Sequence, residues 1–225
     1  MWNISKPLPA GLFSITVFFN FHTAFSALLV VDMNIGKTLY VSDRGHWRNW
    51  LQENHLKEKE IWLIYYYKKT GKPRIPYDDA VEEALCFGWI DSTVKKIDEM
   101  RYAQRFSPRR KNSPLSQANK ERIVKLISNH QMTQAGLNAI ADVFKPGGEI
   151  EVEFIVPPDI LEAIKANPAA WENYIKLPPA YRRTRIAYID SRRRHGEVMF
   201  RKSLEHFIKM TEKGKRFGFV HVQAP

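Results

Sequence analysis

The sequence predicts an α+β protein, with a small antiparallel sheet flanked by helices and followed by a helical C-terminal region. Runs of β-branched and aromatic residues, typical of strands, occur between residues 60 and 107. Apolar residues at helical spacing surround these runs. From Pro157 onward the pattern is helical, and prolines recur where helices can begin.

The composition sets broad limits on function. A chain of 225 residues with 44% hydrophobic side chains can build a sizeable core. Its formal net charge of +11 attracts anions: nucleic acid, acidic membrane surfaces, or phosphorylated and carboxylated small molecules. The single cysteine, Cys86, excludes an intramolecular disulfide and a multi-thiolate zinc site. We therefore expect a reducing, cytoplasmic location.

The first segment, residues 1–38, differs in character from the rest. Residues 7–31 carry no charged side chain. Four interpretations stay open: a secretory signal, a membrane anchor, a docked or disordered arm, or a true start at Met33 that puts the segment outside the native protein. The start at Met33 is preferred, and no stable membrane insertion is expected after it.

Residues 39–145 are expected to form one α+β domain. Asp43 is a typical helix N-cap residue, and Gly88 is placed to end a later helix. The run EIWLIYYYK is typical of a central strand, and Asp98-Glu99 lies near the turn of a predicted hairpin. The expected elements are helices at 44–54, 77–87, 116–129 and 133–144, and strands at 60–68, 89–97 and 100–107.

Residues 146–225 are expected to form a helical region packed on that domain. Pro146-Gly147-Gly148 predicts a linker before it. Three prolines each stand at or near a helix start: Pro158, Pro168 and Pro178. The last helix presents an apolar face made of Phe200, Leu204, Phe207 and Ile208.

Two stretches go beyond generic pattern: EALCFGWID at 83–91 and QRFSPRR at 104–110. Together with Tyr66–Lys69 and Tyr77–Ala80, they resemble the YdeI/OmpD-associated family of bacterial proteins. The chain from Val156 through the last helix resembles the helical C-terminal region of that family, so the likeness runs from about Tyr40 to about Lys215.

The resemblance implies a general role and no chemistry. The family name refers to bacteriocin protection and to association with an outer-membrane porin. No catalytic residue, cofactor or substrate is implied. The chain has Leu115-Ser116 where the family typically has a Trp-Ser pair, which leaves any role of that aromatic side chain in doubt. We therefore expect a non-enzymatic binding or stress- and bacteriocin-tolerance protein.

A candidate anion-accepting cleft follows from the basic stretch 101–125, which holds eight positive charges against one negative. Strand alternation places Arg101 and Arg105 on one face and Tyr102 and Phe106 on the other. Asp91 follows apolar residues at a strand start, and Arg105 is its expected partner. Because arginine forks bind carboxylate or phosphate at two points, the predicted ligand-binding residues are Lys69, Trp89, Asp91, Arg105 and Arg109.

Alternative functions use the same region. An enzyme would use Cys86 or Asp91 as its reactive group, although a free cysteine on an apolar helix face is more typical of core packing. Weak, salt-sensitive and sequence-independent nucleic-acid binding is the third alternative. The seven histidines show no metal-ligand spacing, so neither a metal nor a cofactor is expected.

Two further sets of charged residues are expected to have structural rather than functional roles. The early helix carboxylates, Glu82 and Glu83 among them, are expected to serve the helix dipole. The cluster Arg182–Lys202, with eight positive and two negative charges, is expected to be a solvated helical surface.

A chain that begins at Met33 should express as soluble protein with the melting temperature of the full chain. The reason is the abrupt change in character at that residue. Differential scanning fluorimetry of both chains measures this, and a marked fall in the shorter chain would show that the segment packs on the core.

Overall fold

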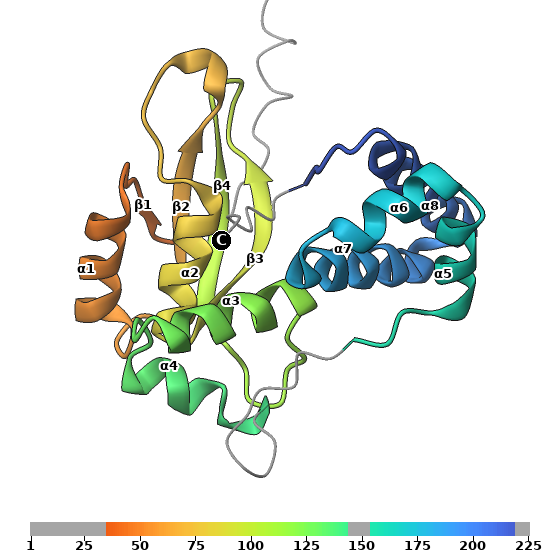
Figure 1. Cartoon of the computed structure of the whole chain (residues 1–225). Helices are drawn as coiled ribbons and strands as arrows, with labels where there is room; N and C mark the ends of the chain where they lie inside the picture. The colour runs from red at the N-terminus through yellow and green to blue at the C-terminus, as the bar shows by residue number, and fades with distance from the viewer. Residues whose placement is uncertain (1–34, 144–153, 219–225) are drawn as a thin grey trace, which may run out of the picture. The chain divides into compact units, whose positions relative to one another are not determined.

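The computed structural model describes residues 35–143 and 154–218 (Figure 1). The expectations for the first segment before Ile35 and for a linker at 146–148 lie outside these residues. The described part is α+β as predicted: it contains a four-stranded sheet, and its elements after residue 154 are helical. No helix within the two described ranges is long and apolar enough to cross a membrane.

Four strands form one sheet: β1 (Thr38–Leu39), β2 (Ile61–Tyr66), β3 (Trp89–Lys96) and β4 (Arg101–Pro108). The order is β1-β2-β4-β3, in which β2, β4 and β3 are antiparallel neighbours. This confirms the predicted hairpin and the interior position of β2. The short β1 pairs in parallel with β2, so the sheet is mixed rather than purely antiparallel. A two-residue strand is too short to show a period, which is why the sequence pattern missed it.

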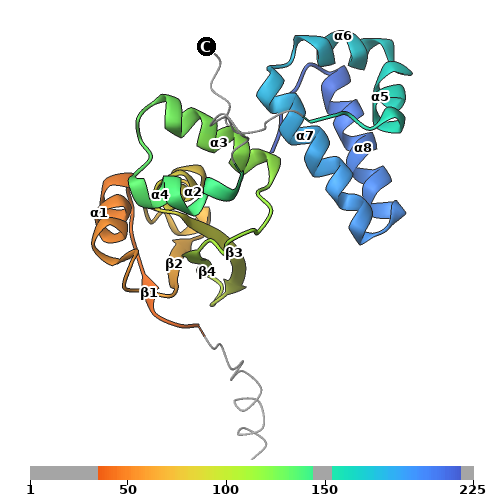
Figure 2. The ribbon, with the colours of Figure 1, turned by 90° about the horizontal axis from the view of Figure 1, so that it is seen from below.

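Four helices follow the predicted positions and lie on one face of the sheet (Figure 2). They are α1 (Arg44–Asn54), α2 (Tyr77–Cys86), α3 (Gln117–Ser128) and α4 (Gln134–Ala139). Short side chains cap three of them: Asp43, Ser116 and Thr133 each accept a hydrogen bond from the backbone amide three residues later. The 3₁₀ helices η1 (Lys68–Thr70) and η2 (Ala141–Val143) complete this part.

The core of this part lies between the sheet and the helices. Ile61, Leu63 and Tyr65 alternate along β2 toward the helices, where they join buried α1 side chains such as Trp47. The intervening Trp62 and Ile64 are buried on the other face of β2 with Ala103 of β4. A strand that buries both faces reads as a continuous apolar run, as the sequence of β2 does.

A buried carboxylate joins α1 to α2. Glu83 is 2% exposed and accepts charged hydrogen bonds from Arg44 and Arg48, the Arg48 Nη1–Glu83 Oε2 distance being 2.6 Å. Glu82 binds the same Arg44 at 2.9 Å. The expectation that these two glutamates serve the helix dipole stays a prediction, because an ion pair does not exclude that interaction. They bind cations on the neighbouring helix, a contact that no local pattern within α2 encodes.

Between residues 154 and 218 the structure describes four α-helices and one 3₁₀ helix. They are α5 (Pro158–Lys165), α6 (Pro168–Lys176), α7 (Pro179–Ser191), η3 (Arg192–His195) and α8 (Glu197–Glu212). Proline opens α5, α6 and α7, where its missing amide costs no helical hydrogen bond. The predicted apolar face of α8 is confirmed, with Phe200, Leu204 and Phe207 buried in the core of these helices.

A short strap, residues 215–218, lies against α7 after α8 ends. The Tyr181 hydroxyl of α7 holds the strap by two hydrogen bonds. It donates to the Phe217 carbonyl and accepts from the Phe217 amide, both at 3.0 Å. At Gly218 the φ angle is +91°, and a Cβ atom there would lie 2.5 Å from Nη1 of Arg185. Glycine therefore lets the strap run directly against the Arg185 guanidinium.

Replacing Glu83 by Gln should lower the free energy of unfolding by about 2 kcal/mol. The reason is that Arg44 and Arg48 lose their buried counter-charge, while their own partial exposure limits the loss. Urea unfolding followed by circular dichroism measures this. The control is Glu172→Gln, which removes a carboxylate from an exposed pair with Lys176 and should leave the midpoint unchanged. Equal midpoints for both variants would contradict the prediction.

Candidate anion-binding site

The predicted pair of Asp91 and Arg105 does not form. Asp91 accepts a hydrogen bond of 2.6 Å from the Tyr77 hydroxyl, whereas Arg105 donates to Glu60 at 2.8 Å. The register explains the error: Asp91 lies opposite Phe106, so strand alternation turns Arg105 to the other face of the sheet. The same alternation separates the arginines of β4 from its aromatic side chains, as predicted: Arg105 lies on one face of the sheet and Phe106 on the other.

Arg109 is a structural residue in this fold. Its side chain is 1% exposed and forms an ion pair of 2.8 Å with Asp142. The same guanidinium donates to the carbonyls of Ala139, at 2.7 Å, and Ser113. It thus fastens η2 and the end of α4 to the end of β4, and its hydrogen bonds go to protein groups.

The five residues predicted to bind a ligand do not line one cavity. Trp89 is buried, and its indole donates to the His55 carbonyl at 3.1 Å. Lys69 is exposed on η1. Only Asp91 of the five lines the cavity described next. Ligand binding at Trp89, Arg105, Arg109 and Lys69 stays a prediction that their present partners do not favour.

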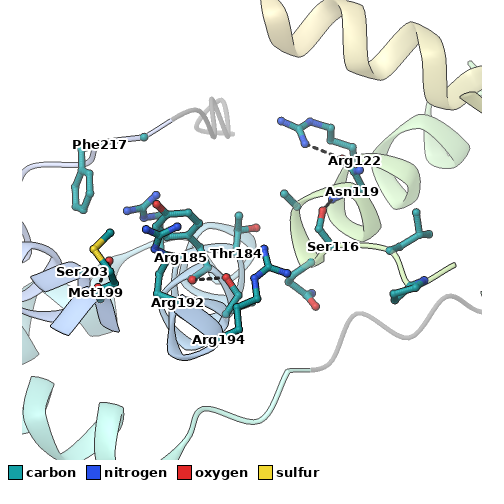
Figure 3. Close-up of a pocket in the computed structure, with 18 of the residues that line it drawn as sticks. Ser116, Asn119, Arg122, Thr184, Arg185, Arg192, Arg194, Met199, Ser203 and Phe217 are labelled. Atoms are coloured by element: carbon teal, nitrogen blue, oxygen red, sulfur yellow. Dashed lines mark hydrogen bonds between the residues drawn. The ribbon is translucent and has the colours of Figure 1, made fainter. Parts of the chain in front are cut away.

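A cavity of about 990 Å³ opens beside α7, η3, α8 and the strap (Figure 3). Residues around α3, together with Tyr77 and Asp91, form its other side. Arg183 of α7 and Glu121 of α3 make a two-point ion pair, with N–O distances of 2.6 and 2.9 Å. Four cationic side chains line the cavity from the helical side: Arg185, Arg192, Arg194 and Lys202.

These four cations have no carboxylate partner among the described residues. Elsewhere in the same ranges the well-buried arginines are paired: Arg109 with Asp142, and Arg122, across the cavity, with Asp78 at 2.6 Å. The cavity wall on α7, η3 and α8 is therefore a concentration of positive charge without its own counter-ions. Such a wall attracts anions.

Arg185 stands out within this wall, since only 8% of its surface is exposed. Phe217 of the strap covers it, with the ring centroid 4.2 Å from the guanidinium carbon. Its Nε has no hydrogen-bond partner among the described residues, and neither has the Nε of Arg192 or the buried hydroxyl of Thr184. Burial lowers the pKa of Arg185, because removing the guanidinium from water disfavours its charged form.

The expectation that the cluster Arg182–Lys202 is a solvated helical surface is wrong at Arg185, which is buried. The available signal was the i, i+3, i+7 spacing of Arg185, Tyr188 and Arg192, which places all three on one helix face. Composition could not predict the burial of Arg185, because the number of positive charges in the cluster does not depend on whether a strap distant in sequence covers one of them.

Cys86 is buried in the core of the α+β part, as expected for a free cysteine on an apolar helix face. Burial raises the pKa of its thiol to about 11, and the neighbouring Glu83 acts in the same direction. A thiol in this environment is a poor nucleophile near neutral pH. In the described ranges no group of three or more His, Cys, Asp or Glu side chains could hold a metal ion.

The native thiol should react very slowly with Ellman's reagent at pH 8, where a pKa near 11 leaves roughly one thiol in a thousand ionised. The rate should rise as the pH approaches 11. The absorbance of released thionitrobenzoate measures it, and the chain unfolded in guanidinium is the control that reacts at the ordinary rate. Fast modification of the native protein at pH 8 would restore Cys86 as a candidate nucleophile.

Comparison with known proteins divides the chain into two matched ranges. Residues 39–139 match the family model described as Domain of unknown function (DUF8412), and this range includes both stretches that carry the sequence resemblance. Residues 153–214 match the model described as Bacteriocin-protection, YdeI or OmpD-Associated. No curated protein and no solved structure matches the chain. The resemblance to the YdeI/OmpD-associated family is thus confirmed for residues 153–214, the range that carries the cationic cavity wall.

Proposed function

We propose that this protein binds an anionic ligand through the cationic wall formed by Arg185, Arg192, Arg194 and Lys202. The observation that carries the proposal is the buried guanidinium of Arg185, which lines the cavity and pairs with no carboxylate among the described residues. This retains the anion-accepting cleft expected from the sequence and moves it from β4 to α7, η3 and α8.

The energetics of an unpaired buried charge support this proposal. Taking a guanidinium out of water costs free energy, which a partner charge and hydrogen bonds normally offset. Contacts with Phe217 and Tyr188 offset part of that cost through the ring faces. These contacts leave the Nε hydrogen without an acceptor, and an anion in the cavity would supply one.

A protective role against bacteriocins or stress rests on the family description alone. Binding is the part of the expected function that the residues themselves support. The acid of the enzyme alternative, Asp91, faces the same cavity but already accepts a hydrogen bond from Tyr77.

Pyrophosphate or citrate should raise the melting temperature of the full chain, because a ligand that binds only the native state stabilises it. At about 100 times the dissociation constant the gain is about 2.7 kcal/mol, or roughly 5 °C or more for a chain of this size. Arg185→Met should abolish the shift. In ligand-free buffer this variant should melt no lower than the wild type, since it replaces an unpaired buried charge by an apolar side chain.

Arg201→Met is the matched control. It removes the same charge from α8, where Arg201 is exposed and paired with Glu197, and the anion-induced shift should survive. Isothermal titration calorimetry of the same three proteins gives the affinity directly. The proposal fails if no anion shifts the wild type, or if the shift persists in Arg185→Met.

A further inference from the structure

The cationic wall is built together with aromatic rings as an alternating stack along α7. Phe217 lies 4.2 Å from the Arg185 guanidinium, Arg185 lies 5.1 Å from the Tyr188 ring, and Arg192 lies 5.8 Å from the same ring. At the strap end His206 packs edge-on against Phe217, with the centroids 4.6 Å apart. The order Phe217, Arg185, Tyr188, Arg192 thus alternates rings with guanidinium groups, and His206 adds a second ring at the strap end.

In such a stack each guanidinium uses its face for the rings and keeps its edge for hydrogen bonds. The Nε atoms of Arg185 and Arg192 have no partner among the described residues, and neither does the buried Oγ1 of Thr184, which precedes Arg185. Two guanidinium edges and one hydroxyl therefore offer donors with no acceptor in the described protein. A phosphate group, with several oxygens and close to two negative charges, matches this set better than a single carboxylate does.

The cavity also offers flat and apolar surface that a bare phosphate would not use. Tyr188 is 47% exposed and Met199 is 40% exposed, and both line the cavity. The volume of about 990 Å³ lies at the upper end of the range of about 300–1,000 Å³ found for pockets that bind drug-sized organic ligands. Aromatic side chains and arginine planes are the groups on which nucleic-acid bases stack.

We propose that the anion is a nucleotide: a phosphate ester held by the edges of Arg185 and Arg192, whose planar base packs against the exposed part of the Tyr188 side chain. This inference rests on the proposed anion-binding function and names the chemistry of its ligand. Phosphate and base are shared by free nucleotides and by single-stranded nucleic acid, so the experiment has one arm for each source.

The first arm compares adenosine 5′-monophosphate with ribose 5-phosphate by isothermal titration calorimetry on the full chain. The two ligands carry the same phosphate and sugar, and only the first has a base. Because stacking of one base contributes enough for a tenfold difference, the nucleotide should bind at least about tenfold more tightly. Tyr188→Leu should bring the ratio of the two affinities close to one, because only the nucleotide has a base that can lose its contact.

The matched control is Tyr40→Leu, because Tyr40 is 44% exposed and lies in the other matched range of the chain. It should keep the full preference for the nucleotide. Equal affinities of the wild type for the two ligands would overturn the nucleotide inference while leaving anion binding intact. If neither ligand binds and pyrophosphate also fails, the proposed function itself falls.

The second arm uses a fluorescein-labelled oligothymidylate without a terminal phosphate, followed by fluorescence anisotropy. Binding tighter than that of the mononucleotide, lost in both Arg185→Met and Tyr188→Leu, identifies single-stranded nucleic acid as the source. Preference for the mononucleotide identifies a free nucleotide. Binding that depends on ionic strength but is insensitive to Tyr188→Leu would overturn the inference, since net charge alone would then account for it.

Discussion

The two-residue period of the β2–β4 pairing decides which side chains meet in the α+β part. It turns Leu63, Tyr65 and Phe106 toward the helices, where they form the core with α1 and α2. The same alternation places Arg105 on the opposite face of the sheet, where it donates a hydrogen bond to Glu60. Because the fully buried members each contribute about 1.5–3 kcal/mol, a change of register would cost far more than any surface ion pair could return.

Arginine chemistry connects the fold to the proposed site. Where an arginine holds elements together, a carboxylate meets it, as at Arg109 with Asp142 or at Arg44 and Arg48 with Glu83. Arg185 departs from this rule, because ring faces and no carboxylate contact it among the described residues. Folded proteins seldom bury a charge without a counter-charge unless a ligand or a catalytic step uses it. The anion proposal follows from this contrast within one molecule.

Much of the fold was predictable because local rules dominate it. Caps at Asp43 and Ser116, prolines at helix starts, and the apolar face of α8 each act within a few residues. Local rules predicted less of the proposed site. The wall residues of α7 could be seen as a helix face, but the strap that covers Arg185 comes from more than thirty residues further along the chain.

The sequence by itself determined the α+β class, the order of nearly all elements and, for residues 153–214, the likeness to the YdeI/OmpD-associated family, because spacing and capping are local properties of the chain. Tertiary structure alone decided the partners of Asp91, Arg105 and Glu83, and the burial of Arg185. Those outcomes depend on strand register and on contacts between elements far apart in sequence. A charge pattern records how many arginines are present, and only the fold determines which of them lack a carboxylate.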